Sequence, residues 1–177
     1  MREEEHPQQR VLYVVSCASP VAQYVPGLVM QAQNAHWKVC VITTPHGTKF
    51  LDILSLEGLT SYPVRSHYKQ PDEPDILPRA DALIAFPVTF NTLNKWALGI
   101  TDTLAVGLLC EYTGLKIPLV AVPVTGEGLS SHPALARSVR MLRRYGVRVM
   151  YEPERYPPKN QVPAEVILDE LHQLLRR

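Results

Sequence analysis

Cysteine is scarce in this sequence, and its positions do not suit cross-linking or metal binding. The three cysteines are Cys17, Cys40 and Cys110, with no CxxC motif and no Cys/His spacing typical of a metal site. This pattern predicts reduced thiols in a cytoplasmic protein rather than a disulfide framework. Nor do the residue patterns favour a metal centre or a Ser/His/Asp triad.

The chain also has no excess of positive or negative charge. The chain has 18 basic and 17 acidic residues and a net charge of +1, so no strong field favours nucleic acid or an anionic membrane. No apolar run reaches the roughly 18 residues that cross a bilayer. The first ten residues are polar and acidic, unlike a signal peptide. We expect a disordered tail over residues 1–10 and a single domain over residues 11–177, located in the cytoplasm.

What the sequence does contain is a regular alternation of short apolar runs with helical patterns. Apolar runs predict buried strands at residues 11–15, 39–42, 82–86, 119–122 and 147–150, with a brief further strand at 62–64. Helical patterns cover residues 21–32, 45–56, 91–113 with a break near Gly99, a helix opened by Ser131, His132 and Pro133, and the stretch after Pro163. Residues 65–79, rich in proline and charge, predict a loop.

Strands that are apolar on both faces are typical of a parallel sheet covered by helices on each side. The expected fold is therefore a three-layer, Rossmann-like (flavodoxin-like) α/β fold. Such sheets bind ligands at the carboxyl ends of their strands, near the point where the strand order reverses. In this chain those ends are residues 16–20, 43–48, 87–92 and 123–132.

Hydroxyl side chains follow the first two of these strands, although the dinucleotide fingerprint GxGxxG is absent. Ser19 and the backbone N–H groups of its turn could hold a phosphate. The alternative is a plain strand-to-helix turn that Ser19 caps. Thr44 and Thr48 have the same alternative, and Asn91, after the third strand, could serve only as a helix N-cap.

Residues 87–92, Pro-Val-Thr-Phe-Asn-Thr, resemble the PASANT motif of the homo-oligomeric flavin-containing cysteine decarboxylases. That family includes phosphopantothenoylcysteine decarboxylases and the peptidyl-cysteine decarboxylases of lantibiotic pathways. The likeness continues through Asn-Thr-Leu-Asn-Lys at 91–95 and Gly-Ile-Thr-Asp at 99–102. Further similar segments are residues 44–50, the Ala18-Ser19 turn, and residues 123–133, which align with the family's PxMNxxMW motif and the His-Pro after it. The resemblance spans residues 11–152 in order.

This resemblance implies an FMN cofactor whose phosphate is held by Ser19 and Thr44. The other cofactor-binding positions that it implies are Ala18, Pro20, Phe50, Pro87, Val88, Thr89 and Thr92. Asn91 would recognise a substrate carboxylate, as in family members that oxidise a cysteine thiol to a thioaldehyde, which then loses CO₂. The implied substrate is a small thiol or a peptide, and the implied assembly is a homo-oligomer, a trimer or dodecamer, with the flavin at a subunit contact.

Two departures from the family bear on the reaction. The PxMNxxMW segment has Gly126 at the asparagine, Thr125 at the first methionine and Ser130 at the tryptophan. A glycine cannot replace an amide that holds a carboxylate. The family's histidine base falls near Glu73, whereas His67 stands about six residues earlier. His67 is the candidate base if the loop brings it back, and a surface loop histidine otherwise.

Other features leave the function more open. Phe90 stands where the family has a small residue, and either packs in the core or at a subunit contact or narrows the pocket. The altered segment also fits a non-catalytic, flavin-binding regulatory protein. A flavin prenyltransferase-like enzyme is a further alternative, although no second basic phosphate site accompanies the flavin segments. A basic helix face, which we interpret as solvated surface or a subunit contact, consists of Arg137, Arg140, Arg143 and Arg144.

Overall fold

Five apolar segments form one parallel sheet with the strand order β2-β1-β3-β4-β5. The computed structural model describes residues 9–152, 154–156 and 162–176. Every residue of the two central strands β1 and β3 is buried, as expected for strands with helices on both faces. The strands are β1 (Val11–Ser16), β2 (Lys38–Thr43), β3 (Ala82–Val88), β4 (Leu119–Pro123) and β5 (Arg148–Val149).

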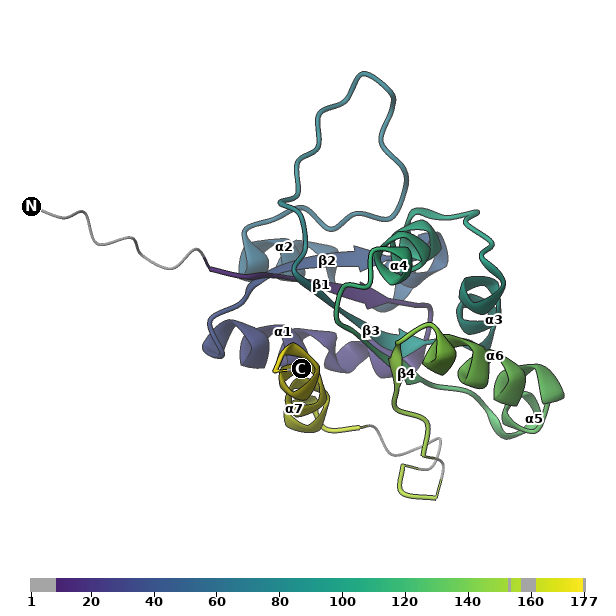
Figure 1. Ribbon diagram of the computed structural model, residues 1–177. Coiled ribbons are helices and arrows are strands. Elements are labelled where there is room, and N and C mark those ends of the chain that lie inside the picture. Colours follow the sequence, from purple (N-terminus) through teal and green to yellow (C-terminus); the bar gives the residue numbers. More distant parts are fainter. Residues whose placement is uncertain (1–8, 153, 157–161, 177) are drawn as a thin grey trace, which may run out of the picture.

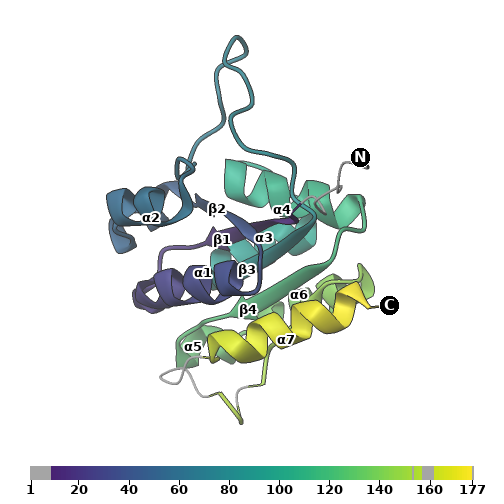
Figure 2. The ribbon, with the colours of Figure 1, turned by 90° about the vertical axis from the view of Figure 1, so that its left-hand side faces the viewer.

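Helices cover the sheet on both faces, as Figures 1 and 2 show. One apolar cluster joins the sheet to α1, α2 and α7, and a second joins it to α3, α4 and α6. The α-helices are α1 (Val25–Asn34), α2 (Ile53–Thr60), α3 (Phe90–Leu98), α4 (Leu104–Gly114), α5 (Glu127–Ser130), α6 (Pro133–Arg144) and α7 (Ala164–Leu175). Two 3₁₀ helices, η1 (Pro20–Tyr24) and η2 (Pro45–Phe50), follow the first two strands. The three-layer Rossmann-like fold expected from the sequence is therefore confirmed.

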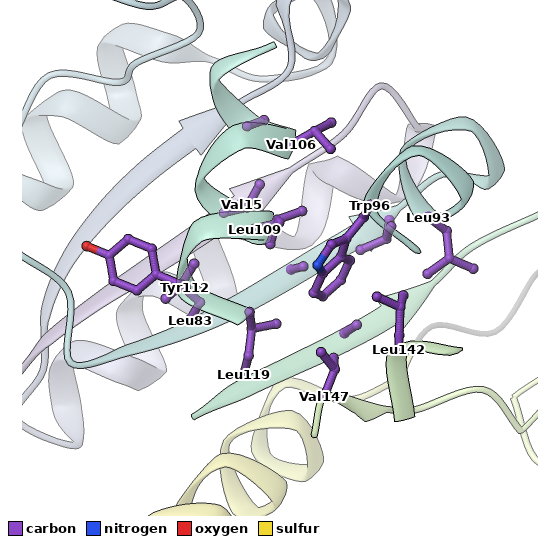
Figure 3. Close-up of a cluster of buried hydrophobic side chains, with 14 of the residues drawn as sticks. Val15, Leu83, Leu93, Trp96, Val106, Leu109, Tyr112, Leu119, Leu142 and Val147 are labelled. Carbon is purple, nitrogen blue, oxygen red and sulfur yellow. The ribbon is translucent and has the colours of Figure 1, made fainter. Parts of the chain in front are cut away.

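The second cluster centres on Trp96 of α3 (Figure 3). Its indole is 2% exposed, and its Nε1–H donates to Thr113 Oγ1 over 3.0 Å. Leu109, Leu135 and Leu142 in the same cluster are fully buried. Burying such side chains stabilises the fold by about 1.5–3 kcal/mol each. The cluster fixes α3, and with it the turn that precedes α3, against the sheet.

The position of any ligand follows from the strand order. The chain moves outward from β1 to β2 on one side, and then through β3 and β4 to β5 on the other. The connections after β1 and β3 therefore diverge to opposite faces, the arrangement that forms a ligand-binding crevice at the carboxyl ends of such sheets. The turns after β1, β2 and β3 border that crevice.

Several element boundaries differ from the expectation. The strand expected at 62–64 is absent, and only Arg65 forms a bridge, with Ile42. The helix expected over 45–56 is divided into η2 and α2, because Asp52 caps α2 by accepting from Ser55 N over 3.1 Å. The helix that residues 131–133 open begins at Pro133, and the side chain of His132 caps it by accepting from Ala134 N.

Other boundaries are as expected. Gly99 ends α3 with φ 72, a left-handed conformation that glycine adopts without strain. Residues 65–79 form a long loop that projects from the layers in both ribbon views (Figures 1 and 2). Of the expected tail, residues 1–8 lie outside the described residues. No helix in the described part of the chain is long and apolar enough to cross a membrane.

Candidate functional site

The turn after β1 places a hydroxyl at the crevice. Ser19 has an extended backbone, and its Oγ accepts from Val21 N over 3.3 Å at the start of η1. The other side chains of this turn leave Ser19 uncrowded, because they are small or, as with Cys17, buried. Since Ser19 Oγ uses a lone pair in this bond, its O–H remains available to donate to an anion.

The turn after β2 repeats this arrangement. Thr44 Oγ1 accepts from Gly47 N over 3.1 Å at the start of η2. Thr48 Oγ1 donates to Pro45 O over 2.8 Å, so this hydroxyl serves the turn itself. Thr44, like Ser19, keeps its hydroxyl hydrogen for a ligand. The capping interpretation of both residues is correct, and it leaves the donor function intact.

Hydrogen bonds tie the three turns together. Thr44 N and Thr43 Oγ1 both donate to Ser16 O, over 3.1 and 3.0 Å. On the other side, Cys17 N donates to Pro87 O over 3.0 Å. The ends of β2, β1 and β3 are thus fixed relative to one another before any ligand is bound.

The second turn also has a position that only glycine fits. A Cβ on Gly47 would lie 3.0 Å from Thr44 Oγ1 and 3.3 Å from Ser16 O, and closer still to Thr43 Oγ1. The buried Ser16 Oγ has no hydrogen-bond partner among the described residues. Several hydroxyls lie together in these two turns, and neither residues 16–20 nor residues 43–48 include a carboxylate. Such a donor set suits a phosphate. These residues therefore fit a phosphate-bearing cofactor.

The turn after β3 has a different cap from the one that the sequence suggested. Thr89, and not Asn91, caps α3, and its Oγ1 accepts from Thr92 N over 3.5 Å. Asn91 is exposed, and its amide makes no hydrogen bond with the residues that the structure describes. The interpretation of Asn91 as an N-cap is therefore wrong. Its amide remains available to a ligand.

Cys17 lies in the middle of the three turns but is an inert thiol. It is 1% exposed. Burial raises its pKa, and hydrogen bonds with Thr92 and Thr89 lower the pKa only in part. A buried thiol with a raised pKa stays protonated at neutral pH and does not act as a nucleophile.

Phe90 lies at the rim of the site and contacts α6. Its ring meets the His132 ring edge to face, with centroids 5.6 Å apart. Asn94 strengthens the same contact between helices, since its Oδ1 accepts from Ser138 Oγ over 2.6 Å and its Nδ2 donates to Phe90 O. Phe90 is half-buried. The sequence did not single out His132 for this role, because the contact joins residues far apart in the chain.

The segment after β4 contributes few polar groups to the site. Val124 N donates to Val88 O over 2.8 Å, which places the segment beside the third turn. Gly126 is exposed and brings no side chain, and Ser130 Oγ donates to Glu127 O within the segment. No side-chain amide is therefore present where the related motif has one.

His67 lies on the projecting loop. Its ring is exposed, and its Nδ1 lies 2.9 Å from Ser66 Oγ. A hollow of about 430 Å³ is lined by His67 and Glu73, among other loop residues. The loop starts beside the second turn, where Thr43 N donates to Arg65 O over 2.8 Å. Within the described residues, no hydrogen bond joins His67 to the three turns.

Comparison with known proteins gives a consistent result. The family model described as Flavoprotein matches residues 1–170. The solved structure of the FMN-dependent cysteine decarboxylase SpaF has a TM-score of 0.74 and 25% identity, with coverage of 95% of this chain and 98% of that chain. A PPC decarboxylase mutant complexed with pantothenoylaminoethenethiol has a TM-score of 0.76 at 17% identity, covers 96% of this chain and 100% of that chain, and supports the fold alone.

The curated relatives are longer proteins. The coenzyme A biosynthesis bifunctional protein CoaBC of Borreliella burgdorferi is 25% identical over 124 residues, which cover 67% of this chain and 31% of that protein. A cysteine/cysteine sulfinic acid decarboxylase from an unknown prokaryotic organism is 27% identical over 103 residues, which cover 55% of this chain and 28% of that protein. The chain thus spans less than a third of the length of either relative.

Proposed function

The chain belongs to the flavoprotein family, and on that premise we propose that it binds FMN at the three turns and oxidises a thiol substrate that then loses CO₂. One observation carries the proposal. Ser19 and Thr44 present hydroxyl groups on turns that are hydrogen-bonded together at the crevice of the sheet. The similarity to the FMN-dependent cysteine decarboxylase SpaF supports the same cofactor.

Ser19 and Thr44 hold the phosphate in this proposal, and Gly47 lets the second turn pack closely against the hydroxyls of Thr43 and Thr44. The positions that line the remainder of the cofactor are Ala18, Pro20, Phe50, Pro87, Val88, Thr89 and Thr92. Bound there, FMN supplies the two-electron acceptor for oxidation of the thiol-bearing carbon. The buried Val88 and the half-buried Thr89 give that region an apolar wall with one hydroxyl.

Asn91 binds the substrate carboxylate that is later lost as CO₂. Its exposed amide belongs to the first turn of α3, two residues after the Thr89 cap, and can donate through Nδ2. Gly126 adds no second amide, so the carboxylate is held by fewer donors than the related motif would provide. The substrate carboxyl group is therefore held loosely, which fits a peptide C-terminus or a small thiol acid.

His67 is the proposed acceptor of the thiol proton. If Nδ1–H donates to Ser66 Oγ at the observed 2.9 Å, the Nε2 lone pair is available as a base. The loop must then close toward the turns, or a neighbouring subunit must supply the contact. A homo-oligomer, a trimer or dodecamer with FMN at a subunit contact, is part of this proposal, and so is a cytoplasmic location.

A flavin-binding protein without catalysis is the second candidate. It is favoured by Gly126, which removes an amide from the substrate side, and by the lack of any hydrogen bond between His67 and the three turns among the described residues. The cofactor residues are the same in both cases. The two functions differ only in whether a thiol reduces the bound flavin.

An anaerobic absorption spectrum separates these possibilities. The purified protein should be yellow, and its flavin band should bleach when cysteine or a peptide with C-terminal cysteine is added. Mass spectrometry should then show a product lighter by CO₂ and two hydrogens. A yellow protein that no thiol bleaches supports the second candidate. A colourless protein that takes up no added FMN would overturn both.

A further inference from the structure

The carboxyl ends of α3, α4 and α6 border a continuous groove that the proposed reaction does not use. One hollow of about 500 Å³ and another of about 650 Å³ share Met141, Arg144 and Tyr145. The groove lies toward the amino edge of the sheet, because α6 leads back to the start of β5. The flavin turns lie at the opposite, carboxyl edge. The groove is therefore separate from the proposed active site.

The neutral polar groups of the groove are already satisfied. Tyr145 O–H donates to Ala97 O over 3.5 Å, and Trp96 Nε1–H donates to Thr113 Oγ1 over 3.0 Å. Cys110 Sγ–H reaches Trp96 O over 3.8 Å. What remains for a partner is therefore apolar surface and positive charge.

The positive charge comes from one face of α6. Arg137, Arg140 and Arg144 are exposed, line the first hollow, and follow one another at helical spacing. None of them forms an ion pair or a hydrogen bond with the residues that the structure describes. Arg143 differs, since its Nη2 donates to Val149 O over 3.0 Å. Three like charges in a row repel one another, and an anionic partner relieves that repulsion.

The apolar surface comes from α3 and the end of α6. Leu98 is 55% exposed and Tyr145 is 48% exposed, and both line the second hollow. Six of the thirteen residues that line the groove are Arg, Tyr, Trp or Met, the types that are enriched where proteins bind one another. It contains one lysine, Lys116, and no acidic residue.

We propose that this groove docks an acidic, amphipathic segment of a partner protein. The segment's carboxylates pair with Arg137, Arg140 and Arg144, and its apolar side chains fill the hollow beside Leu98. A polypeptide fits better than nucleic acid, because apolar side chains such as Leu98 and Met141 line the second hollow and the chain as a whole carries a net charge of only +1. Arginine also forms two parallel hydrogen bonds with a carboxylate, which adds geometric selectivity.

The test uses the full chain and a fluorescein-labelled peptide with Glu along one helical face and Leu along the other. A generic peptide suffices, because recognition rests on charge and apolar area. We expect a Kd on the order of 10 μM, a rise of about tenfold for Arg140→Glu, and a further rise for the Arg137→Glu/Arg140→Glu pair. Leu98→Ala should weaken binding severalfold without changing charge. Lys38→Glu, the matched control on the exposed start of β2, should leave the Kd unchanged.

Several results would overturn the proposal. One is a Kd that the α6 charge reversals leave unchanged while circular dichroism shows folded variants. Another is equal binding of a peptide with Gln in place of Glu. Tighter binding of a single-stranded oligonucleotide or of anionic vesicles would assign the groove to those partners. A change of oligomer mass on charge reversal would assign it to a second copy of this chain. FMN content is read separately and should stay constant.

Discussion

Thr44 N donates to the Ser16 carbonyl oxygen over 3.1 Å, so the turns after β2 and β1 are joined at the backbone. The same oxygen accepts from Thr43 Oγ1 over 3.0 Å. Because the joint is made by main-chain atoms, it does not depend on the hydroxyls that we assign to the phosphate. Substitution of those hydroxyls should therefore change ligand binding more than it changes the fold.

Ser19→Ala should raise the Kd for FMN about tenfold, because a hydrogen bond to a charged group contributes about 1.5–3 kcal/mol. Fluorescence quenching of added FMN measures the Kd directly. Loss of the cap at η1 should lower the free energy of unfolding by about 0.5–2 kcal/mol, so stability is measured beside binding. Asp52→Ala removes a comparable cap at α2, at a position not assigned to the cofactor, and should affect stability alone. Equal FMN affinity in Ser19→Ala and wild type would exclude Ser19 from the phosphate site.

Gly47→Ala should lower the free energy of unfolding by about 1–3 kcal/mol, because the added methyl group meets the Thr43 and Thr44 hydroxyls and the Ser16 carbonyl. It should also reduce FMN retention after gel filtration. Gly58→Ala is the matched control, since nothing lies within 4 Å of a Cβ there. In the helix α2 that change should stabilise the protein by up to about 1 kcal/mol. Similar effects of both substitutions on urea unfolding would contradict the crowding around Gly47.

Asn91→Ala should retain FMN and lower kcat/KM for a C-terminal-cysteine peptide by about ten- to a hundredfold, as expected for loss of one hydrogen bond to a carboxylate. Stability should hardly change, because Thr89 caps α3. Thr89→Ala provides the contrast and should cost about 0.5–2 kcal/mol of stability. Loss of flavin from Asn91→Ala would mean that the amide binds the cofactor instead.

The free energy of unfolding should fall at alkaline pH because of the ionisation of Cys40 and Tyr13. These two residues lie opposite each other in the pairing of β1 with β2. Burial raises the pKa of Cys40 to about 12, and burial followed by the neighbouring Tyr112 raises the pKa of Tyr13. The unfolded chain ionises these groups first, from about pH 8.5 upward, so the folded state then binds more protons. The free energy of unfolding therefore decreases between about pH 8.5 and 12.

Urea unfolding at several alkaline pH values, in a reducing buffer, measures this slope. Cys40→Ala should make the decrease shallower, and Tyr13→Phe should remove a further part above about pH 10. The comparison is between slopes, because each substitution also changes packing. If neither substitution alters the slope, other groups cause the loss of stability at alkaline pH.

Much of the fold could be predicted from local patterns. The apolar runs predicted all five strands, since a strand buried on both faces must be apolar throughout. Gly99 predicted the break between α3 and α4, because its left-handed backbone suits glycine. The motif that begins at Pro87 and the turn around Ser19 likewise predict the position of the proposed site. These features depend on residues that are close together in the sequence.

Other features required the tertiary structure. The strand expected at 62–64 did not form, because only Arg65 comes near β2. The choice of Thr89 over Asn91 as the cap of α3 and the contact of Phe90 with His132 were equally outside the reach of the sequence. The physical reason is common to all of them. Whether a polar side chain finds a hydrogen-bond partner, or an aromatic side chain a packing partner, depends on residues that folding brings together. The apolar periodicity that determines the strands and helices depends only on residues that are close together in the sequence.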